Sequence, residues 1–356
     1  ELLPERKTWK LRRARDFALF LLPAILHVLF APRYDLVIAN GHPPVLMGVA
    51  LRWIQWLAGT PYLYHLQDIH PESAAAAGQT SNGWLARWML REDIASCNAA
   101  SCIVTLSADM RATLLDRPGG QIAAERIHTI NNFPLDVYHP LGDDELPQRF
   151  RNRSPDLFYV LFAGNMGHYQ RLDRVVEAAR LLADNERIHF IFMGAGAVRN
   201  ELESQAGAMV GRTVFFEPHQ PVEVAIACIK QCDLGLASLA PGVYRLAYPS
   251  KTMTYLAAGL PVLTIVEGES NLATEIQESE FGYASGGTEP ARIAASIQAA
   301  LRQRESWTPN RRAELIVRAE GHFGRAQALA AWRRLIRSMA DETDFPHHVH
   351  PRSRAA

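Results

Sequence analysis

The second half of the chain alternates short apolar runs with longer segments in which apolar residues recur at helical spacing. The apolar runs show no polar alternation and end in glycine or polar residues, as expected for strands buried on both faces of a sheet. Strands that alternate with helices of about ten to fifteen residues predict a parallel sheet with right-handed crossovers. The predicted strands are 157–167, 188–196, 213–219, 232–240 and 261–268.

The first half repeats this rhythm with four predicted strands, which are 34–41, 61–68, 101–107 and 126–132. A βα unit before residue 34 is absent from the pattern, or a helix over 8–30 takes its place. The stretch between the halves is rich in proline and charge and is expected to be a linker. The predicted organisation is an N-terminal domain over 1–140, the linker 141–156, a C-terminal domain over 157–308, helices over 309–341 and a disordered tail at 342–356.

The start of the chain is basic and then uncharged. Fourteen uncharged residues, 17–30, follow the basic residues Arg6, Lys7, Lys10, Arg12, Arg13 and Arg15. A membrane span needs roughly 20 apolar residues, and no small-residue cleavage site of a signal peptide follows. Two interpretations stay open: a helix buried against a sheet, and a helix lying on a membrane surface with a basic flank.

Composition removes several classes of function. Hydrophobic residues make up 48% and charged residues 21%, which is typical of a globular protein. Lys plus Arg equals Asp plus Glu at 37 each, so we expect no nucleic-acid partner, and any anion site must be local. The four cysteines form no C-x-x-C pair and no disulfide framework, which favours a reducing compartment.

A lysine stands at the beginning of a predicted helix in "LAYPSKTMTYLAAG" (246–259). The helix dipole disfavours a cation at that end, unless an anion binds there. Ser250 is a candidate N-cap and Lys251 the first helical residue, so Arg245 and Lys251 could hold a diphosphate between them. The alternative is that Lys251 is solvated and that Arg245 pairs with a surface carboxylate.

Ligands of open parallel sheets bind beyond the carboxyl ends of the strands. Neither G-x-G-x-x-G nor a P-loop occurs there, which argues against a nicotinamide dinucleotide. In the first half, Asp68, His70 and Glu72 follow a predicted strand, and His70 is a candidate base. The alternative for these three is an Asp-capped loop whose His and Glu are hydrogen-bonded to backbone.

Five stretches give the chain a specific resemblance. They are "QDIHPESAAAAG" (67–78), "INNFPLDVYHP" (130–140), "AGNMGHYQRLDRVVEAARLL" (163–182), "IFMGAG" (191–196) and "YPSKTMTYLAAGLPVL" (248–263). Together they resemble GT-B glycosyltransferases of family 4, in the branch that builds bacterial O-antigen, capsule and colanic-acid-type polysaccharides. The resemblance implies an α/β fold with two doubly wound Rossmann-like domains facing a cleft and a C-terminal helix that crosses back.

The resemblance also implies an activity, a retaining transfer of sugar from a nucleoside-diphosphate sugar. UDP is favoured as the nucleotide and GDP is the alternative. The expected acceptor is a polyprenyl-diphosphate-linked glycan at the inner face of the plasma membrane, where the enzyme would be cytoplasmic and peripheral. Two rivals stay open: a UDP-sugar epimerase of the same shape, and a non-catalytic protein that binds the donor.

The expected site residues follow from the strand ends and the resemblance. The acceptor side is expected to be catalytic through Asp68, His70 and Glu72. Charge on the departing diphosphate would be stabilised by Arg245 and Lys251, so no metal and no cofactor are expected. No predicted strand ends in an Asp-x-Asp triplet that could hold a metal ion. The expected donor-binding residues are Gly164, Asn165, Gly167, Arg171, Arg245, Ser250, Lys251, Thr254, Glu267 and Glu269.

Three motifs of the chain depart from the family pattern. Many members carry Glu-x7-Glu in the C-terminal domain, where this chain has Leu246 and Thr254. Many carry His before the Asp that ends the N-terminal strand, where this chain has Gln67. Asn165 and Gln170 stand where many members have Arg and Lys, and Arg171 is adjacent to them.

Overall fold

The structure is a computed structural model that describes residues 5–30, 34–76, 83–119, 122–134 and 145–342. The predicted tail at 342–356 lies outside these residues except for its first position. In the N-terminal half the elements are α1 (Glu5–Phe30), β1 (Val37–Asn40), α2 (Leu46–Ala58), β2 (Tyr62–His65), α3 (Glu72–Ala76), α4 (Trp84–Ala99), β3 (Cys102–Thr105), α5 (Ala108–Leu115) and β4 (Ile127–Thr129).

The C-terminal half continues the alternation and ends in two long helices. Its elements are α6 (Gln148–Arg151), β5 (Phe158–Ala163), α7 (Leu172–Leu181), β6 (Ile188–Met193), α8 (Arg199–Ala206), β7 (Val214–Glu217), α9 (Val222–Lys230), β8 (Leu234–Ser238), the 3-10 turn η5 (Val243–Arg245), α10 (Lys251–Ala257), β9 (Val262–Ile265), α11 (Asn271–Glu278), β10 (Gly282–Ala284), α12 (Pro290–Arg302), α13 (Pro309–Phe323) and α14 (Arg325–Glu342).

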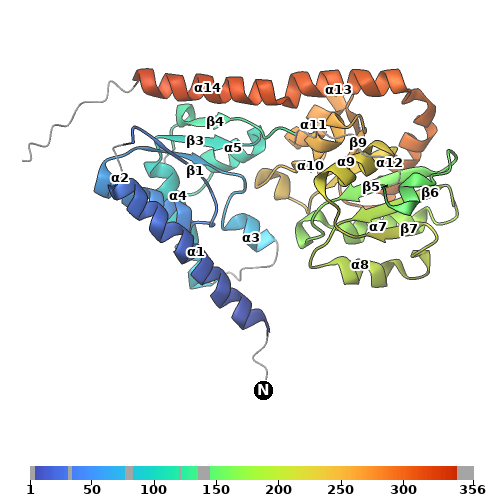
Figure 1. The fold of residues 1–356 in the computed structure, drawn as a ribbon, viewed down its shortest axis with the longest axis horizontal. Coiled ribbons are helices and arrows are strands. Elements are labelled where there is room, and N and C mark those ends of the chain that lie inside the picture. Colours follow the sequence, from blue (N-terminus) through green and yellow to red (C-terminus); the bar gives the residue numbers. More distant parts are fainter. Residues whose placement is uncertain (1–4, 31–33, 77–82, 120–121, 135–144, 343–356) are drawn as a thin grey trace, which may run out of the picture.

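The N-terminal sheet is parallel, with the strand order β1-β2-β3-β4. Strands in sequential order with right-handed crossovers place α2, α4 and α5 on one face of the sheet. Alternate residues of β2 confirm this: Tyr62 and Tyr64 pack with Leu51 of α2, whereas Leu63 packs with Leu335 of α14. The final helix therefore crosses back to cover the second face, as the resemblance implied (Figure 1).

The C-terminal sheet is also parallel and has the order β10-β9-β8-β5-β6-β7. Successive strands are added first on one side of β5 and then on the other, so the order reverses between β5 and β8. Such a reversal leaves a crevice at the carboxyl ends of the two strands. β8 and β9 are buried along their whole length, which explains their uninterrupted apolar sequence. The sequence analysis missed β10, a strand of three half-buried residues.

The part of the predicted linker that the structure describes, 145–156, is packed against the C-terminal half. Phe150 is buried and meets Tyr159 of β5 edge to face. Arg153 pairs with the buried Asp233, whose carboxylate also lies 3.3 Å from Arg304. These contacts fix the chain as it enters the C-terminal sheet.

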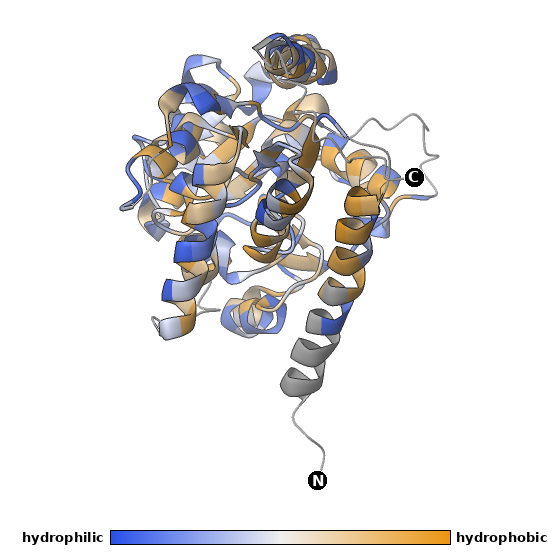
Figure 2. Cartoon of the chain, turned by 90° about the vertical axis from the view of Figure 1, so that its left-hand side faces the viewer, coloured by the Kyte–Doolittle hydropathy of each residue, from blue (hydrophilic) through white to orange (hydrophobic). Residues whose placement is uncertain are grey.

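α1 packs against α2 and not flat against the sheet (Figure 1). The ring of Phe17 meets His42 edge to face, and the outer side of α1 stays exposed. Leu19, Leu22 and Phe30 are 65%, 59% and 83% exposed, and the stretch from Arg15 onward is largely apolar (Figure 2). Within the described residues, no helix combines the length and apolar character that crossing a membrane requires.

Candidate functional site

A cavity of about 460 Å³ opens at the carboxyl ends of β5 and β8, where the strand order reverses. This volume falls within the range of small-molecule sites. Gly164 and Asn165 line it after β5, and Ser238 lines it at the end of β8. The N-terminal half contributes Asp68, so the two halves enclose the cavity together.

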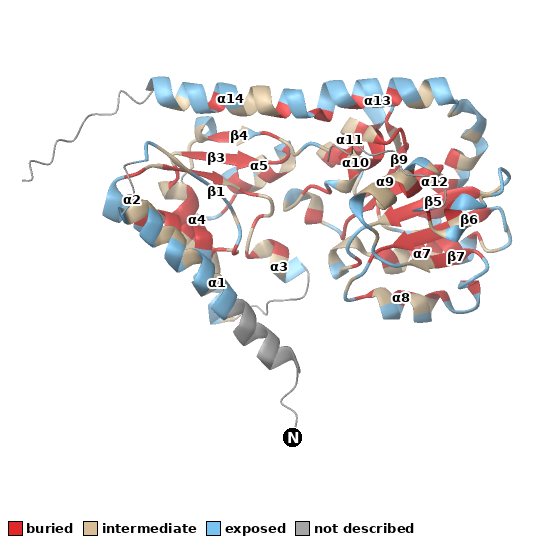
Figure 3. Cartoon of the chain, viewed as in Figure 1, coloured by how far each residue is buried: buried red, intermediate tan, exposed pale blue. Residues whose placement is uncertain are grey.

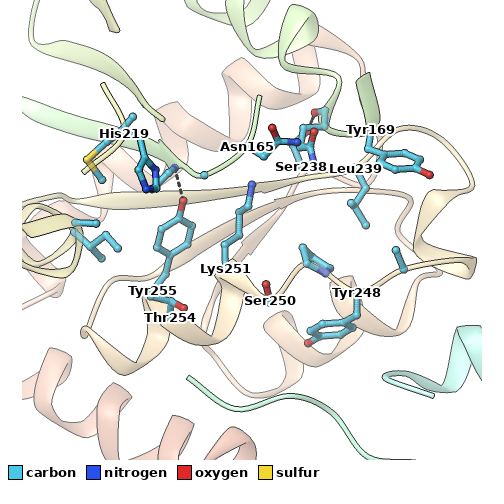
Figure 4. Close-up of a pocket in the computed structure, with 18 of the residues that line it drawn as sticks. Asn165, Tyr169, His219, Ser238, Leu239, Tyr248, Ser250, Lys251, Thr254 and Tyr255 are labelled. Carbon is cyan, nitrogen blue, oxygen red and sulfur yellow. Dashed lines mark hydrogen bonds between the residues drawn. The ribbon is translucent and has the colours of Figure 1, made fainter. Parts of the chain in front are cut away.

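Lys251 begins α10, as predicted, and its amine lies inside this cavity (Figure 4). The Nζ atom sits 3.5 Å from the centroid of the Phe162 ring, and a Cβ built on Gly164 would lie 3.7 Å from it. No carboxylate of the described residues pairs with it, and it is the single Lys or Arg among the residues that line the cavity. Lys251 is therefore not the solvated surface lysine of the alternative interpretation.

Burial in the cavity lowers the pKa of Lys251 to about 7. Burial removes water from around the charged amine. The amine contacts the face of the Phe162 ring, but it has no counter-ion. An anion bound beside it would supply the missing counter-charge. Ser250 occupies the N-cap position without making the expected capping hydrogen bond, so its exposed hydroxyl is free to meet a ligand.

Two glycine turns let the main chain form one wall of the cavity. Gly164 has φ +133° and Gly194 has φ +141°. A Cβ on Gly194 would lie 2.1 Å from the carbonyl oxygen of Gly164, so these two turns pack backbone on backbone. Because Gly164 has no side chain, the end of β5 stays open toward Lys251.

The other end of the cavity is apolar. One face of α9 lines it with Val222, Ala225, Ile226 and Ile229. His219 and Gln220 stand between this face and α10. Tyr255 of α10 closes the wall, and its hydroxyl accepts a hydrogen bond of 2.7 Å from the Ala163 N–H (Figure 4). A planar group fits such a pocket, with its polar edge toward His219 and Gln220.

Thr254 lines the cavity one helical turn after Lys251. Residues three apart on a helix share a face, so Thr254 lies on the same face of α10 as Lys251. It occupies the position at which the family pattern has a glutamate. Its hydroxyl offers one hydrogen-bonding oxygen where a carboxylate would offer two.

Asp68 is the single carboxylate among the residues that line the cavity. It follows β2, and burial raises its pKa. A hydrogen bond between the Ile69 N–H and the Leu246 carbonyl, 2.8 Å long, joins this loop to the C-terminal half. Asp68 and Lys251 therefore face one space from opposite domains.

His70 and Glu72 do not line the cavity. Nδ1 of His70 lies 2.9 Å from the Ser73 hydroxyl, and burial lowers the pKa of His70 to about 4. Glu72 receives two hydrogen bonds, of 2.9 and 2.7 Å, from Arg117. Arg117 also binds Asp93 and the His70 carbonyl, and its side chain is 3% exposed. The partners of these two residues are side chains of the N-terminal half, and not the backbone groups of the alternative interpretation.

Arg245 also lies away from the cavity. It belongs to η5, and its guanidinium is half-exposed, 3.8 Å from Asp116 of the N-terminal half. Its own carbonyl accepts a hydrogen bond of 2.8 Å from Thr113. Arg245 thus lies beside a surface carboxylate, as in the alternative interpretation, and it does not line the cavity that Lys251 enters.

Four further predicted donor residues take other positions. Gly167 and Arg171 line a neighbouring cavity, and Arg171 forms a bidentate pair with Asp173. Glu267 accepts a hydrogen bond of 2.7 Å from the Gly242 N–H and so holds the loop that leads into η5. Glu269 is exposed on the same loop as Glu267 and does not line the cavity.

The sequence analysis missed the apolar end of the site. Val222, Ala225, Ile226 and Ile229 recur at helical spacing, which is the pattern of a core-facing helix. The signal that could have found them is position, because α9 follows directly on the strand end that carries His219. Tyr248 was missed too; it is buried, and its hydroxyl donates to Glu275 at 2.7 Å.

Two family models match the chain, one in each half. The "Glycosyl transferase 4-like domain" matches residues 3–132, and "Glycosyl transferases group 1" matches residues 144–320. The chain belongs to the GT-B glycosyltransferases of family 4. Both sheets and the cavity between the domains fall within the matched segments of this family 4 chain.

Two curated relatives are bacterial glycosyltransferases by name. "Probable glycosyltransferase WbjE" of Pseudomonas aeruginosa is 23% identical over 273 residues, which are 75% of this chain and 66% of the relative. "Putative colanic acid biosynthesis glycosyl transferase WcaI" of Escherichia coli (strain K12) is 25% identical over 237 residues, 65% of this chain and 57% of the relative. The chain thus matches less than two thirds of the length of either relative.

Solved structures share the fold. Anabaena Alr3699/HepE in complex with UDP superposes with a TM-score of 0.68 at 17% identity, over 92% of this chain and 83% of that one. Sucrose-phosphate synthase from Thermosynechococcus elongatus gives 0.66 at 17% identity, over 87% and 75%. At these identities the likeness shows the GT-B fold alone.

Proposed function

We propose that this chain is a retaining glycosyltransferase that moves a sugar from a nucleoside-diphosphate sugar to a lipid-linked glycan in cell-surface polysaccharide synthesis. The observation that carries the proposal is Lys251, an amine without a counter-ion that faces a cavity at the switch point of the C-terminal sheet. The name of one curated relative, a putative colanic acid biosynthesis glycosyl transferase, favours polysaccharide synthesis as the setting.

The cavity suits a donor in one orientation. The diphosphate lies between Lys251, Ser250 and the main chain at Gly164, where charge-assisted hydrogen bonds are available. The base then lies on the α9 face, and the ribose lies beside Thr254. We favour uracil, since a HepE structure holds UDP and the apolar end takes a small planar ring; GDP is the alternative.

The acceptor approaches from the N-terminal half. Asp68 meets a hydroxyl of the acceptor or of the transferred sugar, and Arg117 holds the segment 70–72 behind it. The leaving diphosphate gains negative charge as the sugar departs, and Lys251 stabilises that charge in an enclosed site. His70 and Glu72 contribute by shaping this segment and do not themselves contact substrate.

Titration with nucleoside diphosphates tests the donor site. UDP is expected to bind the wild-type protein more tightly than GDP. Lys251→Ala is expected to weaken UDP binding by about 1.5–3 kcal/mol, as for the loss of a hydrogen bond to a charged group. Equal affinity in wild type and variant would remove Lys251 from the site.

We propose further that transfer needs no metal. Lys251 supplies the positive charge that a divalent cation would otherwise bring to the diphosphate, and Asp68 is the one carboxylate at hand in the cavity. Turnover is expected to survive excess EDTA. A complete loss that magnesium or manganese restores would show that the charge comes from a metal.

The two rivals make different predictions. An epimerase would convert the donor sugar into an isomer without any acceptor. A transferase would leave the donor unchanged as long as no acceptor is present. A non-catalytic protein would bind the donor and turn over nothing. Incubating donor and protein without acceptor, followed by chromatography of the nucleotide sugar, identifies an epimerase. Repeating the incubation with a lipid-linked glycan acceptor separates a transferase, which releases nucleoside diphosphate, from a non-catalytic protein.

We also propose that the enzyme is cytoplasmic and attaches peripherally to the inner face of the plasma membrane through α1. The support is the exposed apolar side of α1 together with the basic residues that precede it in the sequence. Sedimentation with anionic vesicles at low salt tests this attachment. Protein that stays in the supernatant would show that α1 does not serve as a membrane anchor.

A further inference from the structure

A second cavity, of about 720 Å³, lies beside the cavity that Lys251 enters. We call the cavity at Lys251 the donor cavity and the second one the outer cavity. The outer cavity is formed mainly by the start of α7 and one face of α8, and Ala76 of α3 lines it from the N-terminal half. Figure 1 shows α3 opposite the part of the C-terminal domain where α7 and α8 lie. Its volume suits a small-molecule ligand, and the proposed donor does not occupy it.

Two loops separate the outer cavity from the donor cavity. In the turn after β5, Gln170 lines the donor cavity and the next residue, Arg171, lines the outer one. The loop after β8 is divided in the same way between Leu239 and Ala240. The Ala240 N–H donates a hydrogen bond of 2.5 Å to the carbonyl of Tyr169, which joins the two loops. A single layer of main chain therefore lies between the two cavities.

Arg171 brings hydrogen-bond donors to the outer cavity. Its φ of +42° is uncommon for a residue with a side chain, and this conformation costs free energy that a glycine would not lose. Asp173 accepts hydrogen bonds of 2.9 and 2.8 Å from Nε and Nη2 of the guanidinium. The remaining nitrogen, Nη1, has no partner among the residues that the structure describes. Arg171 can therefore donate to a ligand while Asp173 holds its guanidinium in place.

α8 brings hydrogen-bond acceptors to the same cavity. Glu201 and Gln205 are one helical turn apart, so they share a face, and both line the outer cavity. Within the described part of the chain, no cation pairs with Glu201. The Gln205 amide donates to the Asp173 carbonyl at 3.1 Å, which leaves its side-chain oxygen available. Most of α8 is exposed or half-buried (Figure 3), and its buried Leu202 adds an apolar patch to the cavity.

The charges of the outer cavity limit the chemistry of its ligand. One guanidinium, on Arg171, stands against two carboxylates, on Asp173 and Glu201. The cavity is therefore net negative and disfavours a phosphate or another anion. A hydrocarbon chain would leave these polar groups without partners. A neutral sugar fits both properties, because its hydroxyls donate as well as accept and the C–H face of its ring can pack on Leu202.

We propose that the outer cavity binds a neutral sugar residue of the acceptor glycan, next to the sugar that receives the transferred one. This inference rests on the proposed function, which takes the acceptor to be a glycan. Asp68 lines the donor cavity and Ala76 lines the outer cavity, and both belong to the N-terminal half. A glycan that lies along this half reaches both cavities. The C-terminal domain then selects the acceptor through Arg171, Glu201 and Gln205, in addition to binding the donor.

Saturation-transfer NMR with simple glycosides tests the proposal. Methyl glycosides of glucose, galactose, mannose, rhamnose and N-acetylglucosamine are titrated into wild-type protein that is saturated with UDP. We expect at least one of them to bind with millimolar affinity. Glu201→Ala/Gln205→Ala should weaken this binding about tenfold or more, because it removes a hydrogen bond to a charged group. Glu203→Gln is the matched control, since Glu203 is a carboxylate of α8 that pairs with Arg199 and does not line the cavity.

Arg171→Gly separates a binding role from a structural one. The variant removes the guanidinium and also the unfavourable backbone conformation. The pair of Arg171 with Asp173 is about a third exposed, so its loss should cost little stability. We expect weaker glycoside binding and a midpoint of urea unfolding that is unchanged or higher. A lower midpoint with unchanged glycoside binding would show that Arg171 has only a structural role.

Three results would overturn the proposal. The first is that none of the glycosides binds the wild-type protein, and the second is that the Glu201→Ala/Gln205→Ala variant binds them as wild type does. The third is a glycoside that UDP-glucose displaces and UDP does not, which would place it in the pocket for the donor sugar. UDP titration of each preparation separates the two levels of inference. Loss of glycoside binding with normal UDP affinity concerns the outer cavity alone, whereas a wild-type protein that does not bind UDP would refute the proposed function.

Discussion

The pH dependence of donor binding tests the site most directly. Lys251 has a pKa of about 7 in the empty cavity, because burial disfavours its charged form. A diphosphate beside the amine favours the charged form, so binding raises this pKa and takes up a proton. Affinity for UDP should therefore be full below pH 7 and fall as the pH rises through 7. Affinity that is lost as the pH rises is the behaviour expected of a group whose pKa is higher in the complex than in the free protein.

The size of the effect follows from the fraction of protonated amine. With a pKa of about 7, roughly half of the free protein carries the proton at pH 7, about a tenth at pH 8 and about a hundredth at pH 9. UDP affinity is expected to fall about fivefold between pH 7 and 8 and about tenfold between pH 8 and 9. The terminal phosphate titrates near pH 6 and is already ionised across this range.

Isothermal titration at several pH values measures both quantities. At pH 8, two buffers with different ionisation enthalpies should reveal an uptake of about 0.9 proton per UDP bound. Lys251→Met should bind weakly, with an affinity that is flat from pH 7 to 9. Lys230→Met is the matched control, since Lys230 is exposed at the end of α9. A His219→Gln variant removes the other basic side chain that lines the cavity. A wild-type affinity that does not change from pH 7 to 9 would refute the reasoning.

Four further variants, with three matched controls, test the frame around the site. Arg117→Met should lower the free energy of unfolding by about 3–5 kcal/mol, since it leaves the buried Asp93 unpaired. Glu72→Gln should lower kcat and leave the affinity for UDP unchanged. Arg126→Met is the control in the same domain. Gly194→Ala should cost about 2–4 kcal/mol in denaturant unfolding, because its Cβ would meet the Gly164 carbonyl, whereas Gly207→Ala meets nothing and should cost about 1 kcal/mol. Leu335→Ala should cost about 2–4 kcal/mol if α14 covers the N-terminal sheet, and Ile336→Ala, 39% exposed, under about 1 kcal/mol.

Most of the fold could be predicted from sequence, because its strands are buried on both faces. β8 and β9 are uninterrupted apolar runs between helices, and a parallel sheet is the arrangement that buries them. β10 escaped because three half-buried residues give no period to detect. α1 was left between two interpretations, since an apolar stretch does not reveal which surface it meets.

Site residues could be predicted from the sequence only where the position of a residue in its helix or strand determines the direction of its side chain. Gly164, Lys251 and Asp68 come directly after a strand or at the beginning of a helix, and the geometry of these elements aims them at the cavity. Arg245 ends a short 3-10 turn, and its carbonyl accepts a hydrogen bond from Thr113 of the N-terminal half. Its side chain lies beside Asp116, away from the cavity. Glu72 meets Arg117 at a separation of 45 residues, which no local pattern indicates.

Lysine suits position 251 better than arginine would, because a lysine can exist there without an acidic partner. Four of the 37 basic residues of this chain are lysines, and the rest are arginines. Arginine stays charged at any accessible pH, and both the buried Arg117 and the half-buried Arg153 have an acidic partner. An arginine at position 251 would need such a partner, and that acid would repel the diphosphate. Lysine can lose its proton while the cavity is empty and regain it when the donor brings the counter-charge. Under the proposed function, the amine is tolerated without a counter-ion in the free protein and is charged when the diphosphate leaves.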